Sequence, residues 1–355
     1  MRRHEGFTLV ELMVALALSL LLIGGAITMF YFSRLSYQTT EDSSRVQETG
    51  RLAVEFMLRD IRNAGWQGCS REVPVNNVLN DSADVLWNFA EPVAGFDVGA
   101  SNSVDWAPAL PAVVANPLPL PGSDVLVVRG PRREARPLRT VVEINDGTDE
   151  VRTGFFDTTP PIIVPGDTVQ IADCSAIVWF AASGFSQDAG TGQGLVDRVD
   201  SGASPGNATV DLGFGFQEGA ELVPVETVIY YVGANERGEP ALFRRTSRMA
   251  AAEVSIELFE GVEGLQVLYG VDDDGDLSVD DYLDADAVAA AGRWPEVVAV
   301  SFAVLVRSPE EQGIDLETRS FELLGVIYPD GGAGFGDRRR RDVYAATATV
   351  RNRVQ

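Results

Sequence analysis

Residues 6–32 read GFTLVELMVALALSLLLIGGAITMFYF, and this stretch decides how the rest of the chain is organised. Between Leu12 and Tyr31 it holds twenty consecutive residues without a charged side chain. A helix rises about 1.5 Å per residue, so twenty residues cover roughly the 30 Å hydrocarbon core of a bilayer. The stretch therefore predicts a transmembrane helix over 7–32.

The charges around this apolar stretch indicate its orientation and distinguish it from a simple targeting signal. Arg2 and Arg3 precede it, so the positive-inside rule places the start in the cytoplasm and the remainder outside. A secretory signal has a shorter apolar run and a small-residue cleavage site after it, and this stretch has neither. A plain membrane anchor leaves Glu11 unexplained, because a carboxylate there costs about 3 kcal/mol on insertion scales and calls for a partner.

The motif at the start of the stretch supplies a partner for Glu11. Residues 6–12, GFTLVEL, resemble the class III signal of type IV pilins and pseudopilins. The resemblance implies that a prepilin peptidase cuts between Gly6 and Phe7, removes the leader 1–6, and leaves an amine on Phe7 that is then N-methylated. It also implies that Glu11 helps to dock the subunit into a growing filament. A methylated secondary amine keeps its positive charge, so it pairs with a carboxylate in the low-dielectric membrane.

The helix is predicted to continue out of the membrane as an amphipathic segment over 33–65. No proline occurs before Pro74, and charged residues, Asp60 among them, occupy the faces away from the apolar stripe. We expect Gly65 to cap the C-terminal end of the helix and the stripe to pack on the rest of the molecule. The stripe consists of Val46, Ala53, Phe56, Met57, Ile61 and Ala64.

Residues 66–355 read as a β-rich globular head, so the predicted fold is α+β and pilin-like, with a long N-terminal helix packed on this head. The segments 74–122 and 184–207 lack a regular pattern and are rich in turn-forming residues, so we interpret them as irregular insertions. Runs of β-branched and aromatic residues bounded by turn residues predict strands at 125–128, 168–171, 225–231, 265–269 and 297–304.

Composition excludes several classes of function. The formal net charge is −24, from 52 acidic residues against 28 arginines and no lysine, so non-specific binding to nucleic acid is not expected. The single histidine, His4, lies in the leader, and its removal leaves no histidine in the mature chain. Serine–histidine and cysteine–histidine catalysis and histidine-based metal sites are thereby excluded. The chain is expected not to be an enzyme and to require no cofactor.

Blocks beyond the leader are similar to the PilW-type minor pilins and follow the same order along nearly the whole chain. The resemblance implies a non-catalytic minor pilin that primes or caps type IV pilus assembly within a tip complex. Its implied partners are other minor pilins, the major pilin, the prepilin peptidase/methyltransferase and the bacterial inner membrane. The head is then expected in the periplasm and, after assembly, in the pilus tip. The blocks are 58–69, 173–174, 263–272, 294–300 and 351–353.

Two other functions remain open at this point. A minor pseudopilin of a type II secretion system has the same leader and the same anchor. A membrane-anchored adhesin differs in that its head binds a ligand or surface, and nothing in the sequence excludes such a head.

Cys69 and Cys174 are the two cysteines of the chain. In an oxidising compartment outside the cytoplasm we expect them to form a disulfide. The bridge would close a loop of about 105 residues (174 − 69), for which the chain-entropy model gives close to 5 kcal/mol. It would tie the end of the long helix to the head. The alternative is a pair of buried free thiols.

The segment 272–281, DDDGDLSVDD, is the densest cluster of oxygen ligands in the sequence. Asp272, Asp274, Asp276 and Asp280 are the candidate calcium ligands, because Ca²⁺ takes six to eight oxygens at about 2.3–2.6 Å. The EF-hand template fails, since Leu277 falls where that template needs glycine. The alternative is an Asp-Gly hairpin whose charges are solvated.

The segment 338–341 is a run of four arginines. The favoured interpretation is a solvated turn before a strand over 343–350, in which the arginines pair with acidic residues. The alternative is a patch for nucleic acid or anionic lipid.

Overall fold

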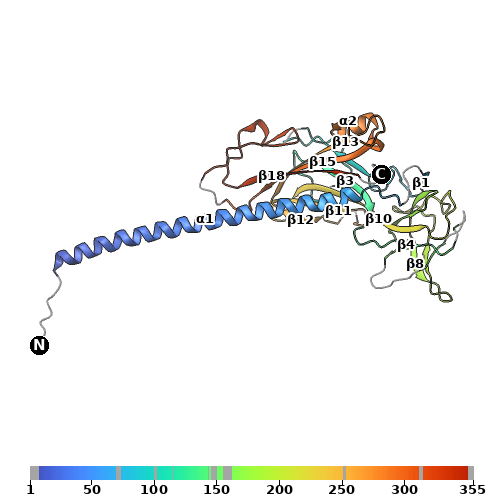
Figure 1. The fold of residues 1–355 in the computed structure, drawn as a ribbon, viewed down its shortest axis with the longest axis horizontal. Coiled ribbons are helices and arrows are strands. Elements are labelled where there is room, and N and C mark those ends of the chain that lie inside the picture. The colour runs from blue at the N-terminus through green and yellow to red at the C-terminus, as the bar shows by residue number, and fades with distance from the viewer. Residues whose placement is uncertain are drawn as a thin grey trace.

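The long helix and the β-rich head predicted from the sequence are confirmed. The computed structural model describes residues 8–68, 73–99, 102–114, 116–142, 144, 150–154, 162–250, 253–311 and 315–350. Figure 1 shows α1 (Leu9–Asn63) carrying the head at its C-terminal end and projecting far beyond it at the other end. With 55 residues at about 1.5 Å each, α1 is about 80 Å long.

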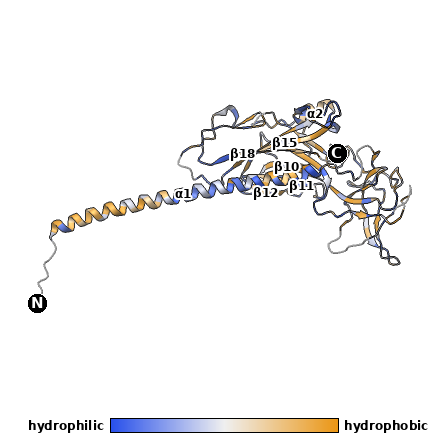
Figure 2. Cartoon of the chain, viewed as in Figure 1, coloured by the Kyte–Doolittle hydropathy of each residue, from blue (hydrophilic) through white to orange (hydrophobic). Residues whose placement is uncertain are grey.

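The two halves of α1 differ in composition and in surroundings. Figure 2 shows an almost uniformly apolar N-terminal half and a C-terminal half in which polar and apolar residues alternate. The large apolar side chains from Leu9 to Phe32 are exposed in the isolated chain. The C-terminal half buries one stripe against the head, which confirms most of the predicted stripe; its members are Val46, Gly50, Ala53, Met57, Asp60 and Ile61.

One member of this stripe contradicts the sequence interpretation. The sequence pattern places Asp60 on a face away from the apolar stripe, but it is 9% exposed and lies among the apolar residues. It is buried because it has ionic and hydrogen-bonding partners in the head, described below. Phe56 is only partly buried, and its ring packs edge-on against Phe259 of the head at 5.5 Å between centroids.

Gly50 is a point of close approach between α1 and the head. A Cβ atom at this position would overlap the ring of Tyr344. Tyr344 belongs to β18 (Arg341–Thr349), the strand that α1 crosses. The missing side chain therefore lets the helix backbone lie directly on an aromatic ring.

Replacing Gly50 with alanine is expected to lower the free energy of unfolding by about 2 kcal/mol, because an added methyl group overpacks the interface. Helix propensity alone would act in the opposite direction by about 1 kcal/mol. Denaturant unfolding of the full chain in detergent measures the change. Gly25→Ala is the matched control, since a Cβ there meets nothing within 4 Å. A Gly50→Ala variant as stable as Gly25→Ala would contradict the close approach.

The C-terminal end of α1 is fixed by backbone geometry. Gly65 has a φ of +63°, as predicted for a glycine that ends a helix. Its N–H donates to the carbonyl oxygen of Arg129 at 2.9 Å. A Cβ atom on Gly65 would lie 2.6 Å from Cγ of Pro92, so both conformation and space favour glycine here.

Among the described residues of the head, the larger sheet has nine strands. Its main path is β1-β7-β6-β10-β11-β12, with β2, β3 and β4 attached beside β10. The 14-residue β10 pairs with β6 and β4 through its first residues and with β3 and β11 through the rest. The strands are β1 (Val75–Asn77), β2 (Val93–Phe96), β3 (Val125–Pro131), β4 (Leu138–Arg139), β6 (Thr168–Ala172), β7 (Ile177–Ala181), β10 (Glu221–Ala234), β11 (Pro240–Thr246) and β12 (Ile256–Glu260).

The second sheet has four antiparallel strands in the order β14-β13-β15-β18, and α1 packs across β18 and β15. Its other strands are β14 (Asp281–Leu283), β13 (Val262–Val271) and β15 (Val297–Arg307). A short helix α2 (Ala285–Ala291) and a 3₁₀ turn η1 (Trp294–Glu296) connect β14 to β15. All five predicted strands are therefore confirmed, in β3, β6, β10, β13 and β15.

Two small sheets complete the described part of the head. One is β5-β9-β8, made of β5 (Glu150–Thr153), β8 (Gly184–Gln187) and β9 (Gly194–Asp197). The other is β16 (Phe321–Leu323) with β17 (Val326–Tyr328), followed by the 3₁₀ turn η2 (Asp330–Gly332). The interpretation of 184–207 as irregular is thus wrong at β8 and β9. Both strands are short and begin with glycine, so their sequences do not have the pattern of a strand.

The interpretation of 74–122 as irregular is also wrong in part, because β1 and β2 lie within it and β2 is fully buried. The guanidinium of Arg129 bonds to the stretch between β1 and β2 at two points. It donates to the carbonyl oxygens of Val85 at 2.8 and 3.1 Å and of Glu91 at 2.7 Å. Burial lowers the pKa of Arg129 to about 10, so the side chain stays charged at neutral pH.

Within the described residues the head has two large apolar cores and two smaller apolar clusters. The first lies between α1 and strands of both large sheets, including β3, β10, β13 and β15. The second lies among β6, β7 and β9 and includes the buried ring of Phe216. Figure 1 places the small β8 sheet and the β1 edge at the end of the head farthest from the N-terminus.

Candidate functional site

The candidate assembly site begins where α1 begins. Gly6 and Phe7 lie outside the described residues, so the structure first describes Thr8. The Thr8 hydroxyl accepts a hydrogen bond from the Glu11 N–H at 3.2 Å, and the Glu11 carboxylate accepts from the Thr8 N–H at 3.0 Å and the Thr8 hydroxyl at 2.9 Å. This reciprocal pair is a capping box. Glu11 therefore has a partner inside its own chain, and any bond to a neighbouring amine would compete with that partner.

The apolar half of α1 has the features of a membrane anchor. It is long and apolar enough to cross a bilayer, and none of its most apolar 18-residue window is buried in the structure. Such a surface is stable only in lipid or against other apolar surfaces. Glu11 lies in the first turn of the helix, where the helix dipole favours a negative charge.

The joint between α1 and the head is a buried ionic cluster around Asp60. Arg133, from the loop after β3, donates through Nε and Nη2 to the two Asp60 oxygens at 2.9 and 3.0 Å. The hydroxyl of Tyr230, on β10, donates to Asp60 Oδ2 at 2.5 Å. The Arg133 guanidinium also lies 4.3 Å from the centre of the Phe56 ring.

In this joint, burial and the charge of Asp60 act on the Tyr230 hydroxyl in the same direction. Burial and the negative charge of Asp60 raise the pKa of the Tyr230 hydroxyl, so it stays protonated and donates. Arg244 of β11 lies with its Nε 3.9 Å from Asp60 and pairs with Glu226 at 2.7 Å. One carboxylate thus links the helix to β10 and to the loop after β3. Sequence reasoning missed this role, although a lone acid within an apolar helical stripe is a usable signal.

Of the two cysteines, the structure describes Cys174 but not Cys69. Cys174 is disulfide-bonded and lies in the turn between β6 and β7. Cys69 lies outside the described residues, so the bridge between the two stays a prediction.

The acidic loop 272–280 connects the antiparallel strands β13 and β14, as the hairpin interpretation expects. Carboxylate oxygens of Asp272, Asp274 and Asp276 lie within 4.8 Å of one another. Asp280 is not part of this group, and its Oδ2 instead accepts from the N–H of Asp273 at 2.7 Å. Of the four candidate ligands, the structure therefore brings three together.

The four arginines of 338–341 have alternating surroundings. Arg341 is almost fully buried and bonds to Glu263 and Asp337, each at 2.6 Å at its closest. Arg339 also turns inward, and its Nη1 donates to the carbonyl oxygen of Ser308 at 2.9 Å. Arg338 and Arg340 are exposed. The favoured interpretation is confirmed for the pairing with acidic residues, but its solvated turn is wrong at Arg341, which is 2% exposed.

A second acidic cluster, which sequence reasoning missed, lies where β2 meets the second sheet. Asp124 is 2% exposed and accepts from the N–H groups of Val98 at 3.1 Å and Val267 at 2.8 Å. Burial, and then the charge of Asp97, raises the pKa of Asp124. The pKa of Asp97 is raised to about 6, first by burial and then by Asp284 and Asp286.

This cluster predicts a pH dependence of stability. A carboxyl with a raised pKa in the folded state stabilises the fold fully below its unfolded pKa of about 3.9, and this contribution is lost as pH rises through about 6. We expect the melting temperature of the wild type to fall between pH 5 and pH 7 by about 2 °C relative to Asp97→Asn, because Asp97 is only half-buried and partly screened. Thermal unfolding of both proteins across that range measures the difference, and parallel profiles would refute it.

A long helix with one bare apolar half and one half packed on a β-rich head is the architecture of a type IV pilin-like protein. Residues 1–27 match the family model of the prokaryotic N-terminal methylation motif, and residues 229–352 match that of the type IV pilus-assembly protein W. Together the two matches support a PilW-like type IV minor pilin. No curated protein and no solved structure matches it.

The two matches have a clear place in the structure. The first covers the start of α1 and most of its apolar half. The second begins within β10 and includes β11 to β18, so it contains the whole second sheet. The second core and the small β5-β9-β8 sheet lie outside both matches.

Proposed function

We propose that this minor pilin primes or caps type IV pilus assembly as a non-catalytic member of a tip complex. Its partners are other minor pilins, the major pilin and the prepilin peptidase/methyltransferase, and its head lies in the periplasm before assembly. The match to the type IV pilus-assembly protein W supports this proposal most directly. The bare apolar half of α1 supports anchoring in the inner membrane beside other subunits.

Processing is the first step of the proposed role. The peptidase cuts between Gly6 and Phe7, and the new amine of Phe7 is methylated. Mass spectrometry of the N-terminal peptide from membranes should therefore begin at methylated Phe7. A peptide that still contains Met1 or His4 in the mature protein would remove the basis of the proposal.

The decisive experiment counts surface pili in a strain deleted for this gene, with the membrane pool of major pilin measured in the same cells. We expect few or no pili despite a full pool, restoration by the wild type, and no restoration by Glu11→Val. Glu55→Val is the matched control, since Glu55 is exposed on the same helix. Normal pili with impaired protein secretion would identify a type II pseudopilin instead. Normal pili with lost surface attachment would identify an adhesin.

We also propose that the acidic loop binds calcium through Asp272, Asp274 and Asp276. Three carboxylates within 4.8 Å of one another support this, because they offer the hard oxygen ligands that Ca²⁺ prefers. Isothermal titration should give a Kd of about 10⁻⁴–10⁻³ M, in the range of extracellular calcium modules. At 10 mM calcium the fold should then gain about 1.4–2.7 kcal/mol.

The control for calcium is a double variant, Asp274→Ala with Asp276→Ala. It should bind no calcium and melt at the same temperature with and without the ion. Absence of heat with the wild type, together with equal calcium responses of both proteins, would refute the calcium site.

A further inference from the structure

A groove runs beside the soluble half of α1. Its first part is a cavity of ≈450 Å³ between the helix and the end of β12. Leu52 of α1 and Leu258 and Phe259 of β12 give this part an apolar floor. Arg45 and Pro309 line the end of this cavity that is nearer the membrane.

The groove continues toward the membrane as a second cavity of ≈200 Å³. Arg45 and Pro309 line this part too, and Gln38, Glu41 and Asp42 of α1 face Glu310 across it. We call the two cavities together the stalk groove. It has an apolar floor at one end and an acidic notch at the other.

The charges of the stalk groove are unbalanced. Two guanidiniums line it, those of Arg45 and Arg307, and both are already paired: Arg45 with Glu41 at 2.7 Å, and Arg307 with Glu263 at 2.7 Å. In the notch Arg45 is the guanidinium among the described lining residues, and it lies beside three carboxylates, those of Glu41, Asp42 and Glu310. Burial, and then the charge of Glu310, raises the pKa of Asp42. The carboxylates along the groove number five, namely Glu41, Asp42, Glu48, Glu260 and Glu310.

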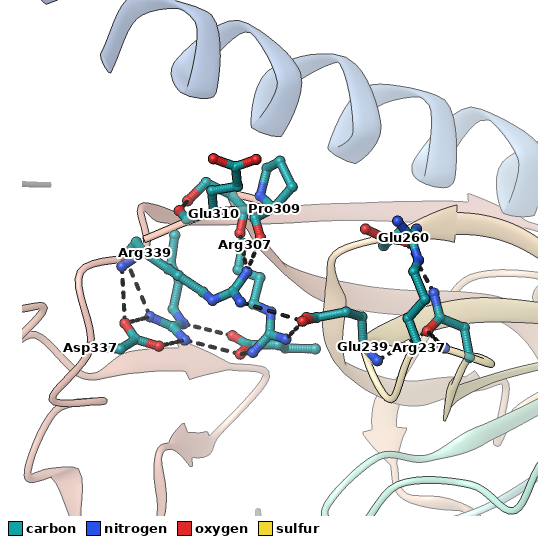
Figure 3. Close-up of polar contacts among 12 residues, drawn as sticks. Arg237, Glu239, Glu260, Arg307, Pro309, Glu310, Asp337 and Arg339 are labelled. Carbon is teal, nitrogen blue, oxygen red and sulfur yellow. Dashed lines mark hydrogen bonds and ion pairs between the residues drawn. The ribbon is translucent and has the colours of Figure 1, made fainter. Parts of the chain in front are cut away.

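Bonds made by two arginines hold the wall opposite α1. In Figure 3, Pro309 and Glu310 lie nearest the helix, and arginine–carboxylate pairs lie behind them on the side away from the helix. Arg307 bonds to Glu239 as well as Glu263, and Arg339 donates to the carbonyl oxygens of Ser308 and Pro309. These bonds fix the Pro309 turn, so the groove exists before any partner arrives and little ordering cost is left for binding.

The position of the groove indicates what reaches it. The uncharged part of α1 ends near Phe32, and Gln38 follows six residues, or about 9 Å, further along the helix. A second protein anchored in the same membrane therefore brings the segment just outside its own anchor to this height. Basic residues in that segment would complement the acidic notch.

We propose that the stalk groove binds a basic segment of a second membrane-anchored pilus subunit. An arginine or lysine of that segment lies among Glu41, Asp42 and Glu310, and an apolar side chain lies on Leu52 and Phe259. This inference rests on the proposed function, because it takes the partner to be another subunit of the same filament.

In-cell photo-crosslinking tests the proposal. A photoreactive amino acid replaces Thr49, which lines the groove and is half-buried. We expect a crosslink to a different subunit that carries a prepilin-type N-terminus, mapped by mass spectrometry to a peptide containing arginine or lysine. Asp42→Arg should reduce the crosslink at least about tenfold, because like charges face each other across the interface.

The matched control is Glu322→Arg, an exposed charge reversal on β16, whose sheet packs on the face of β15 away from α1. It should leave the crosslink unchanged, and blotting with thermal unfolding shows that both variants are folded. No crosslink, a crosslink to lipid or to a second copy of this chain, or insensitivity to Asp42→Arg would overturn the proposal.

Pilus counts in the same strains separate this inference from the proposed function. Restored pili without a crosslink from position 49 would leave the assembly role standing and refute the groove. Normal pili in the deletion strain, with a charge-dependent crosslink to a secretion pseudopilin, would refute the pilus role and leave groove binding to a membrane-anchored subunit standing.

Discussion

Asp60→Ala is expected to lower the free energy of unfolding by about 3 kcal/mol, because it leaves the buried side of a guanidinium without its counterion. Arg133 would lose both of its bonds to Asp60, and the Tyr230 hydroxyl would lose its acceptor. The value lies at the low end of the range for broken buried pairs, since the Arg133 side chain is 21% exposed and keeps some hydration. Denaturant unfolding of the full chain in detergent, followed by tryptophan fluorescence, measures it.

Two further variants show whether the loss comes from this cluster. Glu55→Ala removes an exposed acid from the same helix and should change the free energy of unfolding by less than about 0.5 kcal/mol. Arg133→Met combined with Asp60→Ala should be less destabilising than the sum of the two single changes, because no unpaired charge remains. Strict additivity, or an Asp60→Ala variant as stable as Glu55→Ala, would contradict the ionic joint.

Removing the predicted disulfide is expected to have the largest effect on stability. Cys69→Ser with Cys174→Ser should lower the free energy of unfolding by about 2–5 kcal/mol, because the unfolded chain regains the freedom of a loop of about 105 residues (174 − 69). Cys174 is disulfide-bonded, and the turn that carries it lies between two strands of the larger sheet. The same unfolding measurement gives the value.

The wild type under reducing conditions is the control for this variant. Reduced wild type and the double serine variant should unfold at the same denaturant concentration, below that of the oxidised protein. Alkylation of two thiols in the unreduced, denatured wild type would show that the bridge does not form.

Much of the fold was predictable because its signals are local. The apolar run up to Tyr31, the stripe from Val46 to Ile61 and the glycine at position 65 each specify helix geometry without help from distant residues. The five predicted strands are continuous runs of β-branched and aromatic residues, which are typical of strands buried on both faces.

The errors arose where distant residues decide the outcome. β8 and β9 form strands because they pair with each other and with β5, although their own sequences are rich in turn-forming residues. β2 is buried because it pairs with β3. Asp60 reads as a surface residue until Arg133 and Tyr230, at least 73 positions away, supply its partners.

Some parts of the candidate site were predictable from the sequence, and others were not. The pattern of residues 6–12 is a continuous motif, and the family match to 1–27 agrees with it. The stalk groove was not predictable, since Leu52, Phe259 and Pro309 come from three separate elements that only the fold brings together. The same holds for the raised pKa values of Asp97 and Asp124, which depend on burial in the assembled head.

The way α1 is attached also has a mechanical consequence. The buried residues of the helix, from Val46 to Ile61, lie along its C-terminal turns, so the helix and the head overlap lengthwise. A tensile force along the helix therefore loads these contacts together, in shear, instead of peeling them apart one by one. The ring of Tyr344 against Gly50 and the ion pair of Asp60 lie at successive points along this overlap. A force that pulls on the membrane anchor is therefore resisted both by close packing and by an ion pair.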